Sequence, residues 1–261
     1  MLNCKQSTSM ILNSIKIHLH NVCKNNFLIN TIFEIQYSFN VIFIQEPSWS
    51  ILRTIPSSTN CEGDELVEVP NYPNWVTFSR SYMQSNNFSR VITYINICLS
   101  SLRFSLRNDI LQHRDISYVS FFNHRLFFSL INVYSNSSQA ALKYLKNTEV
   151  EISNILILTG DFNIRDHFWD LNFPYHSYHR ETLFEIVDSL QLEISESYEF
   201  FSTRYSNDPQ ISNLMLDLVF LHPGYSEFNN HHIHSNWRLL SDYTPITVDI
   251  SITEEQVHTK K

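Results

Sequence analysis

Several short segments of the chain place a carboxylate, an amide or a phenol at the end of an apolar run or inside one. The residues are Asn21, Glu46, Tyr134, Asp161, Asn163, Asp217 and Asp242. Carboxylate and amide oxygens are the ligands that a hard cation such as Mg2+ takes, and they also hold water or phosphate groups. A site for a metal ion, a water or a phosphate would form if the fold brought these side chains together.

The segment GDFN follows the apolar run at 155–159. Successive side chains of a strand point to opposite faces, so Asp161 and Asn163 share one face while Phe162 points to the core. Ordinary polar turns show the same pattern, because Asp and Asn side chains bond to the nearby backbone. Taken alone, GDFN leaves a functional site and a simple turn both open.

Asp217 lies inside the apolar run LMLDLVF. An acid buried there is costly unless it is paired or bound to a cation, although a cross-strand hydrogen bond would also account for it. Glu46 has a structural explanation as a strand-end acid before a proline turn, and Asp242 as part of a Ser-Asp cap. Several oxygen-bearing residues at different strand ends nevertheless favour a divalent-cation site over unrelated structural roles.

Short apolar runs and period-2 alternation predict the strands that would position these side chains. The expected strands are 14–22, 41–47, 74–80, 90–96, 115–122, 126–134, 154–161, 213–222, 230–235 and 243–252. Apolar residues at helical spacing predict helices within 25–39, 137–153 and 180–194, and residues 48–74 are expected to form a long loop.

Strands and helices alternate in both halves of the chain, with an all-β stretch between the halves. This order predicts an α/β (α+β) fold in which two β-sheets stack face to face with helices outside. We expect one domain over 14–252, with flexible tails at 1–13 and 253–261.

The composition limits the function classes. Hydrophobic residues make up 43% of the 261 residues, as in globular proteins, and the net charge of -8 argues against a protein that coats nucleic acid non-specifically. No apolar run approaches the roughly 20 residues that span a bilayer, and no signal peptide is evident. The four cysteines are scattered, so we expect them reduced and the protein intracellular, with a nuclear location and the oligomeric state left open.

The motifs HNV, IFIQEP, NVY, GDFN, LDLVF and SDYTPI occur in an order that resembles the endonuclease/exonuclease/phosphatase superfamily. The chain is most similar to the apurinic-endonuclease-like domains of LINE-type (non-LTR) retrotransposons, fungal elements included, from about Asn21 to Ile250. The resemblance implies a four-layer αββα sandwich of two mixed sheets flanked by helices. It also implies cleavage of a phosphate ester that depends on Mg2+, or alternatively on Mn2+.

The resemblance also implies roles for individual residues. Glu46 matches a metal-binding glutamate, Asn21 matches a site asparagine beside it, and Asp242 matches the acid of a terminal Ser-Asp-His motif on the metal side. Asp161 matches the aspartate that activates or orients the attacking water, and Asn163 matches an asparagine that positions the phosphate.

Two further matches complete the implied site. Tyr134 matches a tyrosine that contacts the phosphate, and Asp217 matches an aspartate that orients the histidine of the terminal motif.

The chain departs from the family pattern at two positions. Tyr243 stands where the family has that histidine, and Cys23 stands where relatives have Asp or Asn. A phenol with a pKa of about 10 supplies a neutral hydrogen bond and is no useful base near pH 7. Losing one acid–base group typically costs roughly 10²–10⁴ in rate, about 3–5 kcal/mol. The nearby residues 231–234 include three histidines, for which a strand-surface cluster is the simpler interpretation than a substitute for the missing one.

Three functions therefore remain open. The first is a Mg2+-dependent DNA-nicking phosphodiesterase of retrotransposon type with impaired or lost activity. The second is a degenerate domain that binds nucleic acid or is vestigial, and the third is a phosphatase or phosphodiesterase for a small phosphate ester. DNA is the expected partner of an active enzyme, a reverse transcriptase acting in trans is left open, and no membrane partner is expected.

Overall fold

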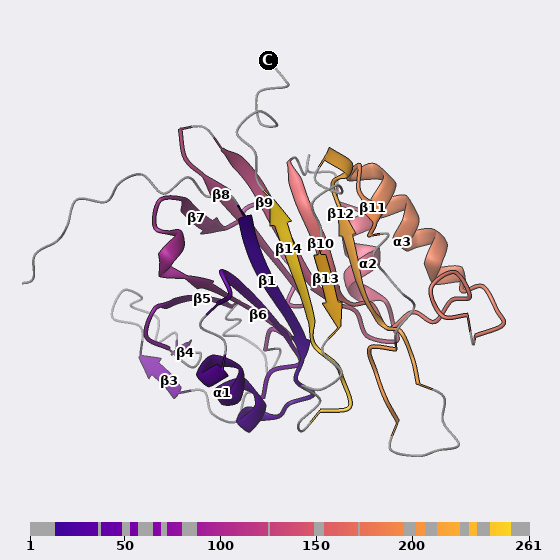
Figure 1. The fold of residues 1–261 in the computed structure, drawn as a ribbon, viewed down its shortest axis with the longest axis horizontal. Coiled ribbons are helices and arrows are strands. Elements are labelled where there is room, and N and C mark those ends of the chain that lie inside the picture. The colour runs from indigo at the N-terminus through magenta and orange to yellow at the C-terminus, as the bar shows by residue number, and fades with distance from the viewer. Residues whose placement is uncertain are drawn as a thin grey trace, which may run out of the picture.

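The computed structural model describes the chain in separate ranges, which Figure 1 draws as coloured ribbon. The ranges are 14–35, 38–48, 53–56, 65–68, 72–79, 88–124, 126–148, 154–171, 173–195, 202–206, 213–224, 230–233 and 241–251. The predicted tails at 1–13 and 253–261 lie outside the described residues. Among the described residues, no helix is long and apolar enough to cross a membrane.

The first sheet has six strands around a parallel pair. In spatial order they are β13 (Asn230–Ile233), β14 (Ile246–Ser251), β1 (Ser14–Asn21), β2 (Val41–Gln45), β6 (Val91–Asn96) and β5 (Trp75–Ser79). Strands β1 and β2 run parallel, and the other neighbours are antiparallel. The helix that links β1 to β2 allows this parallel pairing, because a tight turn cannot return a chain in the same direction.

The second sheet repeats this plan. Its order is β11 (Glu193–Ile194), β12 (Asp217–Leu221), β10 (Ile155–Asp161), β9 (Phe127–Tyr134), β8 (Ile116–Phe122) and β7 (Arg103–Leu106). Strands β9 and β10 form its parallel pair, and the remaining neighbours are antiparallel. A short hairpin of β3 (Arg53–Pro56) and β4 (Glu65–Glu68) lies within the expected long loop.

The two sheets face each other across one apolar layer, and helices cover their outer faces (Figure 1). Helix α1 (Asn26–Ile35) packs on the first sheet, with Asn25 capping it by accepting from the Leu28 N–H at 3.2 Å. Helices α2 (Ala140–Lys146) and α3 (Tyr178–Ser189) pack on the second sheet. The predicted sandwich of two mixed sheets with helices outside is confirmed.

Several boundaries differ from the sequence-based expectation. The helix expected at 180–194 begins earlier, because the Ser177 side chain accepts from the His179 N–H, and it ends at Ser189, so that residues 193–194 join a sheet. The helix expected at 137–153 covers only Ala140–Lys146, and residues 149–153 lie outside the described part of the chain. Strand β7 was not expected, since a short edge strand has little periodicity.

The apolar layer turns polar at one end of the sandwich. There Gln45 of β2 donates to Asn132 of β9 at 2.6 Å, and the hydroxyls of Thr93 and Ser117 lie 2.8 Å apart. These bonds join the two sheets and satisfy polar groups that are buried from water. The sheets are thereby fixed to each other beside the ends of β1 and β10.

Candidate active site

The carboxyl ends of both parallel pairs meet at this polar end of the sandwich. Asn21 is the last residue of β1 and Glu46 follows β2, while Tyr134 and Asp161 are the last residues of β9 and β10. Antiparallel strand β12 begins there, because Asp217 pairs directly with Asp161. The topology therefore brings together residues that are far apart in the sequence.

Gly160 explains why a glycine precedes Asp161. Its φ is +149°, a conformation that favours glycine, and a Cβ at this position would lie 1.8 Å from the carbonyl oxygen of Val133. Only glycine allows β10 to approach β9 this closely. As a result, Asp161 lies directly opposite Tyr134 in the register of the two strands.

Asp161 is fully buried and held by several donors. Its carboxylate accepts from the Asn21 side-chain amide at 2.8 Å, from the Asn163 N–H at 3.0 Å and from the Tyr243 hydroxyl. Burial raises the pKa of Asp161 to about 6, and the charge of Glu46 acts in the same direction. This carboxylate therefore has a fixed orientation and changes its charge near neutral pH.

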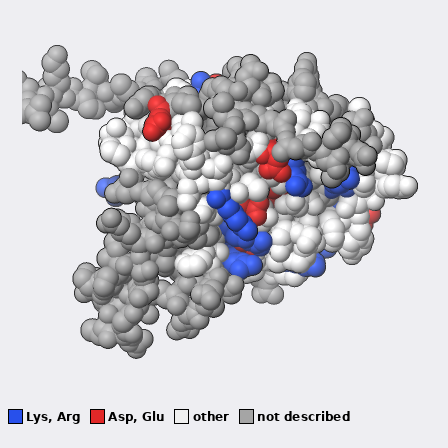
Figure 2. All heavy atoms as spheres, turned by 90° about the horizontal axis from the view of Figure 1, so that it is seen from below, with Lys and Arg blue, Asp and Glu red and all other residues white. Residues whose placement is uncertain are grey.

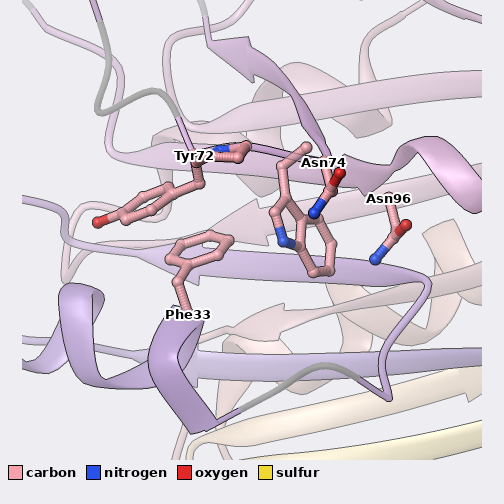
Figure 3. A pocket seen from close by; sticks show the side chains of 6 residues that line it. Phe33, Tyr72, Asn74 and Asn96 are labelled. Atoms are coloured by element: carbon pink, nitrogen blue, oxygen red, sulfur yellow. The ribbon is translucent and has the colours of Figure 1, made fainter. Parts of the chain in front are cut away.

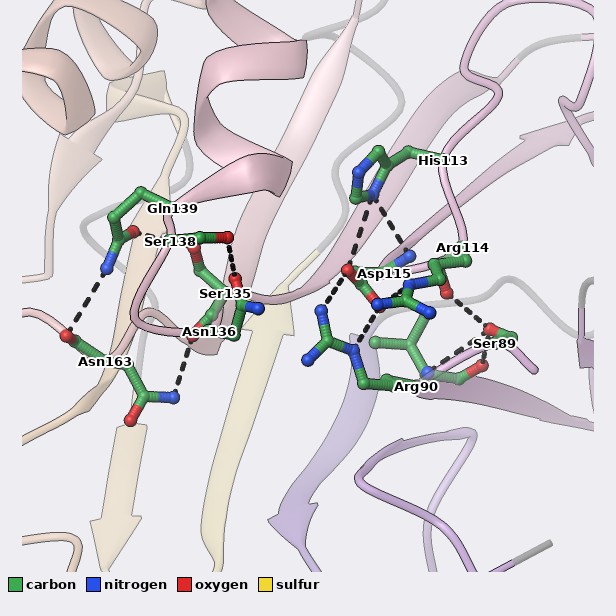
Figure 4. A network of polar contacts seen from close by, with 11 residues as sticks. Ser89, Arg90, His113, Arg114, Asp115, Ser135, Asn136, Ser138, Gln139 and Asn163 are labelled. Atoms are coloured by element: carbon green, nitrogen blue, oxygen red, sulfur yellow. Dashed lines mark hydrogen bonds and ion pairs between the residues drawn. The ribbon is translucent and has the colours of Figure 1, made fainter. Parts of the chain in front are cut away.

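Asn163 adopts a left-handed φ of 50° directly after the buried segment. Its side-chain amide donates to the Ser135 carbonyl at 2.8 Å, and the Gln139 amide donates to the Asn163 carbonyl (Figure 4). The Gln139 amide also donates to the Phe162 carbonyl. These contacts hold the turn after β10 against the loop after β9. GDFN is thus both a backbone-bonding turn and part of the cluster, and the two interpretations of the sequence are compatible.

Glu46 also has a left-handed φ, of 46°, and its N–H donates to the Arg90 carbonyl at 2.9 Å. Its carboxylate accepts from the Asn21 amide at 3.4 Å and from the Tyr134 hydroxyl. The Asn21 oxygen, in turn, accepts from the Cys23 N–H at 2.9 Å. Asn21 therefore bridges Glu46 and Asp161 as a donor, and its role as a metal ligand stays a prediction.

Asp217 is buried beside Asp161. Burial and the Asp161 charge raise its pKa well above the ordinary value, and hydrogen bonding to Thr203 opposes this shift. The Thr203 hydroxyl also accepts from the N–H groups of Leu216 and Asp217, at 3.0 and 3.1 Å. Thr203 is a site residue that the sequence did not indicate.

Asp242 lies at the rim of the buried group. Its Oδ2 accepts from Arg204 Nε at 3.0 Å. Burial raises the pKa of Asp217 and of the exposed Cys23 thiol, and the charge of Asp242 adds to both shifts. The neighbouring Ser241 hydroxyl donates to the Asn21 carbonyl at 3.1 Å and accepts from the Tyr243 N–H at 3.0 Å. The terminal motif is thereby tied to the end of β1.

Tyr243 is buried between these carboxylates. Burial and the charges of Asp161 and Asp217 raise its pKa further above the ordinary tyrosine value, so the phenol remains protonated. His231 and His232 lie on edge strand β13, opposite Val248 and Thr247, and their side chains and the whole of His234 are outside the described part. Tyr243 therefore occupies the position of the family's histidine, and the side chain of the buried His20 is hydrogen bonded to the Tyr243 backbone.

Two arginines lie beside the carboxylates and were also missed from the sequence. Arg90 donates to Asp115, and its Cζ lies 4.7 Å from the centroid of the Tyr134 ring. The Cζ of Arg204 lies 5.6 Å from the centroid of the Tyr243 ring. Figure 2 views the end of the sandwich that lies below in Figure 1, and basic side chains flank acidic ones near its centre. The site thus combines a buried acidic cluster with basic groups around it.

The donor set suits a hard divalent cation. Among the described residues, no three His, Cys, Asp or Glu side chains are arranged to hold a metal ion. Mg2+, however, keeps several waters and needs only one or two protein carboxylates. Burial raises the pKa of Asp161 and Asp217, and the charges of neighbouring carboxylates raise it further. A bound cation would relieve this repulsion between carboxylates. Glu46 and Asp242, which are less buried, are the carboxylates that water and a cation can reach.

A separate pocket of about 170 Å³ lies elsewhere on the molecule (Figure 3). It is lined by Phe33, Tyr72, Pro73, Asn74, Trp75 and Asn96. Asn96 is the last residue of β6, whereas Val91, the first, pairs with Gln45 next to the site. This pocket is therefore at the opposite end of the first sheet from the carboxylates.

Comparison with known proteins finds similarity in structure only. No protein-family model matches the chain, and no curated protein matches it. The endonuclease domain of TRAS1, a telomere-specific non-LTR retrotransposon, aligns with a TM-score of 0.61 and 13% identity over 91% of this chain and 98% of that one. The AP endonuclease LMAP from Leishmania major aligns with a TM-score of 0.65 and 12% identity over 92% of this chain and 89% of its own.

A third structure, TDP2 of D. rerio humanized by 14 mutations, aligns with a TM-score of 0.50 and 12% identity over 92% of this chain and 99% of its own. At such low identities the likeness shows the fold alone. It does not test the fungal type expected from the sequence.

Proposed function

We propose that this chain, which has the fold of the endonuclease/exonuclease/phosphatase superfamily, is a Mg2+-dependent phosphodiesterase that nicks DNA with impaired activity. We assign the activity to one domain over residues 14–252. The observation that carries the proposal is the meeting of Asn21, Glu46 and Asp161 at one end of the stacked sheets. An endonuclease domain of a retrotransposon and an AP endonuclease among the structural neighbours support DNA as the substrate.

Asp161 would accept the proton of the attacking water. Three donors fix its orientation, and a pKa of about 6 keeps it mostly ionised at pH 7 while it can still bind a proton. As the water oxygen bonds to phosphorus, the bond from phosphorus to the leaving oxygen breaks, and that oxygen takes a proton from solvent. Asp161 then releases its own proton to bulk water.

Glu46 and Asp242 would hold the cation, with Asn21 or Asn163 close by. Oxygen and amide ligands without Cys or His favour Mg2+ or Mn2+ over zinc. When bound, the ion would neutralise charge on the phosphate. Tyr134, whose hydroxyl donates to Glu46, would orient that carboxylate and contact the phosphate.

Tyr243 is the reason for proposing impaired activity. Its phenol donates to Asp161 and stays protonated far above neutral pH, so it transfers no proton to the leaving oxygen at pH 7. Asp217, placed to orient a histidine, has a phenol nearby instead.

Nicking of supercoiled plasmid tests the proposal. We expect slow conversion to the open circle in Mg2+ or Mn2+, none in EDTA, and none with Glu46→Ala in either metal. Calorimetry should show weaker Mg2+ binding by Glu46→Ala than by the wild type. Nicking that survives EDTA or Glu46→Ala would overturn the assignment.

The second candidate is a degenerate domain that binds nucleic acid without turnover. Tyr243 favours it, because this residue removes an acid–base group while leaving the surrounding hydrogen bonds intact. If neither the wild type nor Tyr243→His cuts DNA while both bind metal, this second candidate replaces the first.

A further inference from the structure

Arg204 lies on a short segment that is anchored on both sides of the site. Its backbone exchanges hydrogen bonds with Leu214, N–H to carbonyl at 2.8 Å in each direction, just ahead of β12. The next residue, Tyr205, donates its N–H to the Asp242 carbonyl at 2.7 Å, and the Thr244 N–H donates to the Thr203 carbonyl at 2.7 Å. The backbone of Arg204 is therefore fixed between the two motifs that contain Asp217 and Asp242.

The guanidinium of Arg204 has one bonded partner and lies near one aromatic ring. Its Nε donates to Asp242 at 3.0 Å, and its Cζ lies over the Tyr243 ring, 5.6 Å from the ring centroid. Among the described residues, its two Nη groups donate to no protein acceptor, and 43% of the side chain is exposed. A pair of parallel N–H donors at the edge of the site matches the oxygens of a phosphate group.

The charge around Arg204 makes this arrangement unusual for a purely structural ion pair. Asp161, Asp217 and Asp242 all act on the same Tyr243 ring through their charges, and Arg204 is the cation that opposes them there. An anionic substrate approaching this cluster would be repelled unless a positive group met it. An exposed pair such as Arg204–Asp242 contributes little to stability, typically about 0.2–1 kcal/mol.

We propose that Arg204, held by Asp242 and the Tyr243 ring, binds a backbone phosphate of a nucleic-acid strand at this site. Tyr243 is then the platform for a permanent cation rather than only the loss of a histidine. The Arg204 group supplies the positive charge that a phosphate needs, but it supplies no proton, since guanidinium does not deprotonate in proteins. This assignment rests on the proposed function for the site, yet it concerns binding and can be tested without turnover.

The test is equilibrium binding of a fluorescein-labelled 20-base-pair DNA duplex, followed by anisotropy in EDTA and measured at several salt concentrations. We expect Arg204→Gln to weaken binding by roughly tenfold to a hundredfold, because a charged hydrogen-bonding pair is lost. The slope of log affinity against log salt should also fall by about 1, as for one lost phosphate contact. Arg204→Lys should keep the slope but bind several-fold more weakly, since an ammonium cannot donate through a planar pair.

Lys16→Gln is the matched control. Lys16 is a half-exposed cation paired with Asp249 at 3.6 Å, near the start of β1 and therefore at the other end of the strand from Asn21. Removing it changes the net charge by the same amount, and we expect its salt slope to equal that of the wild type.

The outcomes separate this inference from the proposed function. Loss of affinity and slope in Arg204→Gln alone supports the inference whether or not any protein nicks plasmid. Equal slopes for the wild type and Arg204→Gln, equal losses in Arg204→Gln and Lys16→Gln, or no duplex binding at all would overturn it, even where nicking is observed. If Arg204→Gln does not fold, Arg204→Lys decides: affinity equal to the wild type shows that the paired donors are not used.

Discussion

Two arginine–aspartate pairs, each beside a tyrosine ring, flank the buried carboxylates, and they use their guanidinium groups differently. Arg90 donates to both oxygens of Asp115, through Nε at 2.6 Å and through Nη2 (Figure 4). Arg204 donates to Asp242 through Nε only. The first pair consumes both donors of one edge, whereas the second leaves its Nη groups at the surface.

Burial separates the two pairs further. The side chain of Asp115 is 1% exposed and that of Arg90 is 22% exposed, against 27% for Asp242 and 43% for Arg204. Arg90 also links two strand ends, because its N–H donates to the Arg114 carbonyl at 3.0 Å. The Arg90–Asp115 pair is therefore committed to the fold beside the site, whereas Arg204 keeps donors available for the phosphate proposed above.

The largest expected effect concerns Tyr243, the tyrosine beside the Arg204–Asp242 pair. Tyr243→His should raise nicking roughly tenfold to a thousandfold, because an imidazole beside Asp217 can carry a proton near pH 7 and the phenol cannot. The measurement is nicking of supercoiled plasmid and of an abasic-site duplex in Mg2+ from pH 6 to 9.

Tyr243→Phe is the control for this change. If the phenol contributes through its bond to Asp161, the Phe variant should be slower than the wild type. A wild type that matches Tyr243→His at every pH would show that Tyr243 is no defect.

The Arg90–Asp115 pair should matter mainly for the stability of the fold. Arg90→Gln leaves the Asp115 carboxylate buried without its main partner, and we expect the free energy of unfolding to fall by about 3 kcal/mol. Urea unfolding measures this. Arg114 Nε also lies 3.6 Å from Asp115 Oδ1. A loss below about 1 kcal/mol, the usual contribution of an exposed ion pair, would show that Arg114 replaces Arg90 as the partner of Asp115.

The sequence predicted the two-sheet sandwich, and which carboxylates lie together, for a simple physical reason. Glu46, Asp161 and Asp217 interrupt or end apolar runs, and strand periodicity makes such interruptions visible. Arg90 and Arg204 are not visible in this way, because their positions depend on partners 25 and 38 residues away in the chain.

Local chemistry limited the prediction elsewhere as well. The Thr203 hydroxyl accepts from two backbone N–H groups but lies in a segment without periodicity. The edge strand at 103–106 is too short to show any periodicity. The left-handed φ values of Glu46 and Asn163 were equally hidden, since neither residue is glycine.

A smaller effect is expected for the carboxylate of Asp161. The pKa of Asp161 is about 6 in the folded protein and 3.8 in an unfolded chain, so the folded state binds more protons between these values. Its contribution to stability is therefore full below pH 3.8 and is lost as the pH rises through 6. In EDTA, the free energy of unfolding of Asp161→Asn should rise relative to that of the wild type as the pH increases from 4 to 7. The expected relative change is on the order of 2 kcal/mol.

Urea unfolding at each pH measures this difference. A gap between Asp161→Asn and the wild type that stays constant with pH would show that the Asp161 carboxylate is not held at an elevated pKa.

The smallest effect concerns the contribution of the Arg204–Asp242 pair to the free energy of unfolding. We expect Arg204→Gln and Asp242→Asn each to change the free energy of unfolding by less than about 1 kcal/mol, because both side chains are partly exposed and water replaces the lost contact. A double-mutant cycle between these two residues should give a coupling of about 0.2–1 kcal/mol. The same cycle between Arg90 and Asp115 should give a clearly larger coupling, since that pair shares two bonds and a buried carboxylate. Equal couplings would remove the distinction between a structural and a ligand-binding arginine, because the two guanidinium groups would then be equally committed to their aspartates. A coupling near zero for Arg204–Asp242, combined with unchanged duplex binding by Asp242→Asn, would show that Asp242 does not orient Arg204.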